Sequence, residues 1–386
     1  MIFLARSLSN RRCSMADWTQ LPYDLITTIA NYLTSVEDFL AFSSVCRSWR
    51  SVYSNKNWTP GPQFPWLMLS EKRNDETRGF FSFDQSKLYE LALPEIRGRR
   101  CWGSSHGWLV TAGFDLEIEL FNPVTRVRIA LPPQFEFPKQ PKMGMVLDWS
   151  RFVYKAIVIK RLLDSRKIDD EYVVMAIYGL ERRLAFARPG YNSWVAVKNS
   201  SCASFRDVAY FEGCIFALCE MGSLLLCEID GPDAPRAVQI GSPLGYDLGR
   251  WDQLYLVESS GDLLMVIRHD YDIWTEYYYE TVDFTVYKFN FDTGNWTEVK
   301  DLGDRALFVG HCCSMSLSTS NIVNCQPNSI YFTVDKLKRW WIYEVKQTGR
   351  DMGIYNMADK SIKNLYSGVD SPSYYSCPIW VMPALS

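Results

Sequence analysis

The feature that most constrains this fold is a strand–turn–strand unit that recurs about every 50 residues, a period typical of repeat architectures. In each copy a strand ends in a turn, and the next strand opens with two large apolar residues three positions apart. Four copies keep this spacing, at Leu88/Leu91, Trp194/Val197, Trp296/Val299 and Ile362/Leu365. Two further hairpins, which lead into Ile129 and Val238, lack the spacing but occupy similar places.

This repeat predicts a mainly β region, a β-propeller, over residues 66–386. A single unit cannot cover its own apolar faces, whereas sheets arranged radially cover each other. The copies indicate six blades, possibly seven, and a β-sandwich plus a barrel is the structural alternative. Expected strands include residues 214–219, 263–268 and 284–289, because each is a short apolar or β-branched run between turn residues.

Residues 17–53 predict a separate, small α domain of three helices. Leu25, Ile26, Ile29, Ala30, Tyr32 and Leu33 spread over an arc of roughly 160° at about 100° per residue. A helix that lies only on its own core needs a stripe of about 100°. Ser35 followed by Asp38 resembles a capping box at the start of a second helix. The surplus apolar surface indicates a partner protein, and a cap packed on the following domain is the alternative.

Leu21-Pro22-x-Asp24-Leu25-Ile26-x-x-Ile29-x-x-x-Leu33, Asp38-Phe39-Leu40 and Val45-Cys46-Arg47-x-Trp49-Arg50 together resemble the F-box. The resemblance implies binding to the Skp-type adaptor of an SCF (Skp–cullin–F-box) ubiquitin ligase and, through it, to a cullin. In that family, Leu21, Pro22, Leu25 and Ile29 would face the adaptor. Val45 and Trp49 would be shared between the adaptor surface and the small core of the motif.

Further stretches lie along the predicted propeller: Ser105-His106-Gly107-Trp108-Leu109, Leu120-Phe121-Asn122-Pro123, Asn328-Ser329-Ile330-Tyr331-Phe332, Asp351-Met352-Gly353-Ile354-Tyr355 and Pro378-Ile379-Trp380-Val381-Met382-Pro383. They resemble, in the same order, the plant F-box proteins with a KIB-type β-propeller. That family implies a propeller that recruits a protein target for ubiquitination.

An aromatic segment at residues 271–279 is the candidate target-binding loop. It contains Trp274, Tyr277, Tyr278 and Tyr279 between two predicted strands, and aromatic residues are enriched at interface hot spots. The alternative is that these rings only pack a long blade insertion.

Composition excludes several classes of function. The net charge of −3 is not the positive charge that nucleic-acid-binding proteins carry. No apolar run approaches the 18 or so residues of a membrane span. Eleven scattered cysteines without a CxxC pair favour reduced thiols in an intracellular protein. His311-Cys312-Cys313 lacks a second ligand pair for zinc, and no hydrolase, P-loop or dinucleotide motif is present. We expect no metal, no cofactor and no catalytic residue.

The first sixteen residues carry three arginines and no acidic residue. A disordered leader is the simpler interpretation, with localisation to the cytoplasm and/or nucleus, and an organellar transit peptide is the alternative. Residues 54–65, rich in Asn, Pro and Gly, are expected to be a linker. The whole pattern favours a non-catalytic substrate receptor. The competing hypothesis is a kinase-sequestering or organellar propeller that works without a ligase and whose helical cap is structural.

Overall fold

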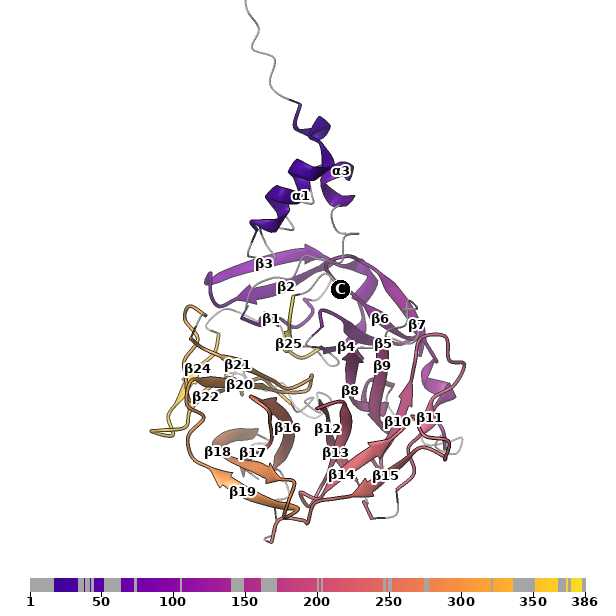
Figure 1. Ribbon diagram of the computed structural model, residues 1–386, viewed down its shortest axis with the longest axis vertical. Helices are drawn as coiled ribbons and strands as arrows, with labels where there is room; N and C mark the ends of the chain where they lie inside the picture. Colours follow the sequence, from indigo (N-terminus) through magenta and orange to yellow (C-terminus); the bar gives the residue numbers. More distant parts are fainter. Residues whose placement is uncertain are drawn as a thin grey trace, which may run out of the picture. The chain divides into compact units, whose positions relative to one another are not determined.

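The computed structural model divides the chain into two compact units, Met1–Gly61 and Pro62–Ser386 (Figure 1). It describes residues 17–33, 38, 42, 45–51, 64–72, 75–104, 106–139, 149–160, 172–199, 201–202, 204–245, 248, 252–273, 278–320, 322–335, 351–366, 373 and 376–383. Side chains are outside the description at Asn31, Arg50 and residues 271–280. The predicted leader lies outside the described residues, as does the predicted linker apart from Phe64 and Pro65.

The helical unit contains η1 (Trp18–Gln20), α1 (Tyr23–Asn31) and α3 (Arg47–Arg50). The Asp17 carboxylate starts η1 by accepting hydrogen bonds from the backbone N–H and hydroxyl of Thr19. Pro22 precedes α1 as its N-cap, and Asp24 lies in the first turn, where a negative charge favours the helix dipole. Of the predicted second helix, only Asp38 and Phe42 are described.

The described part of the second unit contains six sheets, so the predicted six-bladed β-propeller is confirmed. Figure 1 shows the sheets arranged radially. Blade 1 combines β25 (Ile379–Val381), β1 (Trp66–Met68), β2 (Thr77–Ser82) and β3 (Lys87–Ala92); blade 2 has β4 (Arg99–Gly103), β5 (Leu109–Gly113), β6 (Ile118–Phe121) and β7 (Arg128–Leu131); blade 3 has β8 (Val153–Lys160), β9 (Tyr172–Tyr178), β10 (Arg183–Ala187) and β11 (Val195–Ala196).

The remaining blades follow the same order along the chain. Blade 4 has β12 (Phe205–Phe211), β13 (Cys214–Cys219), β14 (Leu224–Glu228) and β15 (Arg236–Gln239); blade 5 has β16 (Gln253–Ser259), β17 (Asp262–Ile273), β18 (Tyr278–Asn290) and β19 (Asn295–Val299); blade 6 has β20 (Arg305–Val309), β21 (Met315–Ser318), β22 (Ser329–Phe332), β23 (Gly353–Asn356) and β24 (Ile362–Asn364). Short helices η3 (Pro94–Ile96), η4 (Gln134–Glu136) and α4 (Trp149–Phe152) lie between strands.

The two ends of the propeller sequence close the ring. Strand β25, near the end of the chain, pairs antiparallel with β1, so that Trp380 lies opposite Leu67. The Trp380 side chain is fully buried, and its Nε1 donates a hydrogen bond to the carbonyl of Val309 in blade 6, at 3.1 Å. The closing strand therefore joins blade 1 to blade 6 through both its backbone and this side chain.

The sequence repeat marks the outermost strand of each blade. The paired positions fall in or beside β3, β11, β19 and β24, and the two irregular hairpins lead into β7 and β15. In three blades an asparagine begins the preceding turn: the amide oxygens of Asn122, Asn290 and Asn356 accept backbone N–H bonds from residues two and three positions on. This Asx turn is a local signal that a single sequence can show.

Blade 6 departs from the regular pattern. Its strand β20 pairs antiparallel with β21 on one side and parallel with β22 on the other. The sequence did not predict this arrangement, because a parallel neighbour depends on the connection and not on the strand itself.

One cysteine prediction is corrected. Cys202, just before β12, and Cys219, at the end of β13, form a disulfide with a Cα–Cα distance of 5.9 Å. The two residues are brought together because β12 and β13 pair antiparallel, with Phe205 opposite Cys219. Cys46, Cys101, Cys214, Cys227, Cys312 and Cys325 are free thiols.

Candidate functional site

Helix α1 carries apolar side chains on two faces. Ile26 and Ala30 are buried and form the inner face. Leu25 and Ile29 lie one turn apart on another face and are 51% and 36% exposed. A helix that packs only on its own unit needs a single apolar stripe, so the second face is available to a partner.

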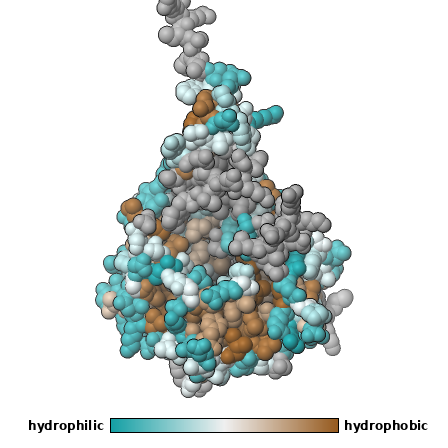
Figure 2. Space-filling model, viewed as in Figure 1, coloured by the Kyte–Doolittle hydropathy of each residue, from teal (hydrophilic) through white to brown (hydrophobic). Residues whose placement is uncertain are grey.

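The exposed face continues beyond the helix. Tyr32, directly after it and two turns from Leu25, is 82% exposed. Trp18, before the helix, and Tyr23, its first residue, are also exposed. Of the predicted adaptor-facing residues, Pro22 is exposed and Leu21 is half-buried. Figure 2 shows apolar surface, in brown, among hydrophilic side chains of this unit. The sequence prediction omitted Trp18, just before the motif, and Tyr23, within it, although both are large aromatic residues.

Val45 and Trp49, which the resemblance assigns to both surface and core, differ in how far their side chains are exposed. Val45 is 51% exposed. Trp49 is half-buried: its ring packs on Phe42 with centroids 4.5 Å apart, and its Nε1 donates to the carbonyl of Trp18 at 2.9 Å. Trp49 therefore stabilises the helical unit, whereas Val45 is open to a partner.

The aromatic segment belongs to the longest hairpin of the propeller. Strands β17 and β18 pair over ten positions, from Leu264 with Lys288 to Ile273 with Tyr278. Residues 271–273 and Tyr278 and Tyr279 are thus strand residues, which corrects the prediction that the whole segment is a loop. Trp274 and Tyr277 lie outside the described residues, as do the side chains of Tyr278 and Tyr279.

Arg268 braces the base of this hairpin from a fully buried position on β17. Its guanidinium donates hydrogen bonds to the Thr281 hydroxyl at 2.7 Å and to the Asp351 carboxylate at 2.6 Å. The same Asp351 carboxylate accepts the backbone N–H of Thr281 at 3.1 Å. These contacts tie both hairpin strands to the start of β23.

The Arg268 guanidinium is surrounded by negative charge. Besides Asp351, the carboxylates of Asp270 and Asp335 lie 3.4 and 3.5 Å from it. A charge buried this completely needs such partners, because an isolated ion loses its hydration. The arrangement fixes where the hairpin leaves the blade.

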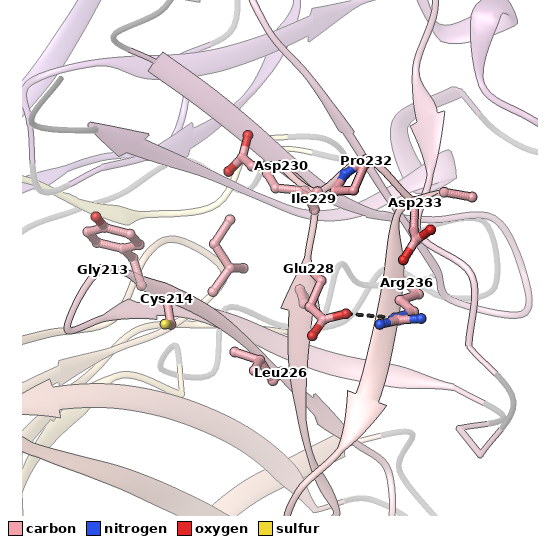
Figure 3. Close-up of a pocket in the computed structure, with 14 residues that line it drawn as sticks. Gly213, Cys214, Leu226, Glu228, Ile229, Asp230, Pro232, Asp233 and Arg236 are labelled. Atoms are coloured by element: carbon pink, nitrogen blue, oxygen red, sulfur yellow. Dashed lines mark hydrogen bonds and ion pairs between the residues drawn. The ribbon is translucent and has the colours of Figure 1, made fainter.

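An open groove of about 440 Å³ lies on blade 4, beside β14 and the connection to β15 (Figure 3). Glu228 and Arg236 pair with each other there, with Nε and Oε2 2.6 Å apart. Cys214 is exposed and free, but none of the groove's described lining residues is a histidine. This groove provides no paired nucleophile and base.

The histidines do not form a shared site. Burial, and then the charge of Lys160, lower the pKa of His106 to about 4. Burial is also the main reason that the pKa of His311 lies well below its usual value. Burial raises the pKa of the neighbouring Cys312 thiol to about 12, so this cysteine is neither a nucleophile nor a ready metal ligand at neutral pH. Among the described residues, no group of three or more His, Cys, Asp or Glu could hold a metal ion.

No described helix is long and apolar enough to cross a membrane. The described residues thus contain two candidate surfaces: the outer apolar face of the helical unit and the propeller face that carries the β17–β18 hairpin.

Comparison with known proteins places both units. The KIB1-4 β-propeller family model matches residues 80–356, and the F-box-like model matches residues 18–59. The protein At5g55150 of Arabidopsis thaliana is 26% identical over 95% of this chain and 97% of its own length. F-box protein SKIP23 of the same plant is 26% identical over 90% of this chain and 91% of its own. F-box protein At2g26160, also from Arabidopsis thaliana, is 26% identical over 84% and 97%. The chain therefore belongs to the plant F-box proteins with a KIB1-4 β-propeller.

Proposed function

We propose that this protein is the substrate-recognition subunit of an SCF-type ubiquitin ligase. The helical unit binds the Skp-type adaptor and, through it, the cullin. The propeller holds a protein target close to the ubiquitin-charged partner, which raises the effective concentration of the two reactants. The chain itself supplies no catalytic group in this proposal.

The single observation that supports the proposal best is the second apolar face of α1. Leu25 and Ile29 are exposed on the same helix that buries Ile26 and Ala30. Exposed apolar patches mark interaction sites in proteins that otherwise bury such residues. Leu25 and Ile29 are two of the four residues that the F-box resemblance places against the adaptor.

The test is co-purification of the full-length chain with a Skp-type adaptor. We expect Leu21→Asp combined with Leu25→Asp to abolish binding, because two charges would have to be desolvated in an apolar interface. Thr27→Asp is the matched control, since Thr27 lies on the opposite side of α1 at about 100° per residue. Undiminished co-purification of the double variant would contradict the proposed interface.

A second measurement separates the ligase from a propeller that only sequesters its partner. Proteins bound by the propeller should accumulate when the proteasome is blocked, and they should accumulate equally without the block in cells that carry the double variant. If neither treatment changes their level, the ligase function is wrong.

A further inference from the structure

Two arginines lie near the starts of the inner strands of blades 3 and 4 and have no carboxylate within 3.5 Å among the described residues. Arg182, in the turn between β9 and β10, places its guanidinium 4.0 Å from the ring centroid of Tyr154. Its Nη1 is buried and has no hydrogen-bond partner among the described residues. Arg206 lies near the start of β12, and its Nε is also buried without a hydrogen-bond partner among the described residues. Both side chains are partly exposed.

Several other arginines of the propeller meet carboxylates at short range. Arg99 lies 2.9 Å from Asp115, and Arg128 lies 2.7 Å from Glu119. By contrast, Arg206 is 3.8 Å from Glu220, beyond hydrogen-bond distance. For Arg182, the described residues provide the Tyr154 ring but no carboxylate within 4 Å.

The surroundings of the two arginines favour an added negative charge. Burial and then the positive charge of Arg182 lower the pKa of Arg206, so the two cations disfavour each other. His311 packs edge-on against Tyr154, with centroids 5.7 Å apart, and its lowered pKa keeps the imidazole neutral. The Phe205 N–H donates to the Arg182 carbonyl at 3.0 Å, which brings Arg182 next to Arg206. An anion bound to the exposed parts of the two side chains would offset their charge repulsion.

The backbone at Arg182 adds a second argument. Its φ is +47°, in the left-handed region where glycine or asparagine is less strained than arginine. The turn therefore holds an arginine side chain at a position where that residue type has no conformational advantage.

The site opens on the same propeller face as the β17–β18 hairpin. Tyr178, before the Arg182 turn, pairs with Val153 at the start of β8, and Arg268, at the base of the hairpin, pairs with Gln253 at the start of β16. The Tyr154 hydroxyl donates to the Gln253 side chain at 3.2 Å. The starts of these two inner strands therefore lie together on that face.

We propose that Arg182 and Arg206 form an anion-binding site that takes a carboxylate or phosphoryl group from an acidic segment of the protein target. Planar guanidinium groups suit both anions, because each offers paired N–H donors in one plane. This inference rests on the proposed function, since it assigns part of target recognition to this face.

The test uses the full-length chain and rhodamine-labelled peptides: hexaglutamate, the same peptide with one phosphoserine, and hexalysine as the charge-reversed control. We expect both acidic peptides to bind and hexalysine not to bind. Tighter binding of the phosphoserine peptide than of hexaglutamate would identify a phosphoryl ligand. Tighter binding of hexaglutamate would identify a carboxylate ligand. Combining Arg182→Asn with Arg206→Gln should weaken acidic-peptide binding about 10- to 100-fold, since charged hydrogen bonds are lost.

Arg183→Gln is the matched control. It removes the same charge from the residue next to Arg182, and the Arg183 side chain is already paired with Glu181. Asparagine is chosen at position 182 because it tolerates a positive φ, so folding should persist; a thermal melt checks this. The anion site is wrong if wild type binds no acidic peptide, if the double variant binds as well as wild type, or if Arg183→Gln loses as much affinity.

The outcome is distinguishable from failure of the proposed function. If the wild-type chain fails to bind the peptides but still co-purifies with the adaptor and lowers the level of its target, only the anion site is overturned. If peptide binding follows the expected pattern but no adaptor binds, the receptor function is overturned and the site stands.

Discussion

The helical unit and the propeller differ in how completely they bury their apolar side chains. Helix α1 exposes Leu25 and Ile29 next to a buried Ile26. In β17, all the apolar residues from Leu263 to Ile267 are at most 5% exposed. The propeller strand is covered on both faces by neighbouring blades, whereas the helix has one covered face and one open face.

The difference shows which unit has apolar surface left uncovered. A propeller whose sheets cover each other and whose ring is closed by β25 is complete in itself. A helical segment of this size has little core of its own and is rarely stable alone. In the proposed function, the helices therefore bind the adaptor through apolar area, and the propeller binds its target through charged and aromatic groups at one face.

Arg268→Ala should lower the stability of the propeller more than any other substitution considered for it. It leaves Asp270, Asp335 and Asp351 around an empty position, and breaking a buried ion pair costs about 3–5 kcal/mol. We expect the free energy of unfolding of the propeller to fall by that amount in denaturant titration, while adaptor binding by the helical unit persists. Arg236→Ala, in an exposed pair with Glu228, should change it by less than about 1 kcal/mol. Equal effects of the two substitutions would contradict the role of Arg268.

Neighbouring residues on α1 should separate stability from binding. Ile26→Ala removes a buried side chain and should destabilise the helical unit by about 2–5 kcal/mol. Leu25→Ala should change stability by less than about 0.5 kcal/mol, as surface substitutions do, yet weaken adaptor binding about tenfold. Helical circular dichroism during melting and adaptor titration give the two readouts. The comparison fails if Leu25→Ala is the more destabilising substitution.

The sequence predicted the propeller through its outermost strands. Those strands mix exposed polar and half-buried apolar residues, as in β19, where Asn295, Thr297 and Glu298 are exposed and Trp296 and Val299 are half-buried; such a mixture is visible in a sequence. Inner strands such as β5 are buried throughout and show no alternation. The closing strand β25 could be recognised only from family resemblance, because three apolar residues carry no pairing information.

The sites were less predictable than the fold. The base of the hairpin was predicted as two strands, but residues 271–279 were expected to be a loop. The extension of both strands is held by Asp351, 70 positions away from Thr281, and such a contact is not visible in the local sequence. Arg182 and Arg206 lie on different blades, and no local pattern marks their approach. The parallel pairing of β20 with β22 was missed for the same reason. Contacts between distant segments are set by packing, which periodicity alone does not report.

Acid should destabilise the propeller selectively. The helical unit contains no histidine among residues 1–61, whereas burial lowers the pKa of His106 to about 4 from 6.5. Between these values the unfolded chain binds a proton that the folded chain does not, so stability is lost as the pH falls from 6.5 to 4. The slope is about 1.4 kcal/mol per pH unit for one such group. Denaturant titrations at several pH values should show a smaller slope for His106→Gln than for wild type, and identical slopes would exclude a buried neutral His106.

The smallest expected effect concerns the turns that join the two outer strands of a blade. Asn290 accepts the backbone N–H groups of Asp292 and Thr293 at 2.9 and 3.0 Å, and Asn290→Ala removes both bonds. Because the turn is exposed and water can replace part of the interaction, we expect the propeller to lose about 1 kcal/mol of unfolding free energy. Asn364→Ala, on the exposed edge strand β24, should have almost no effect. A loss as large as that of Arg268→Ala would mean that the turns, and not the buried contacts between blades, make the propeller independent of a partner.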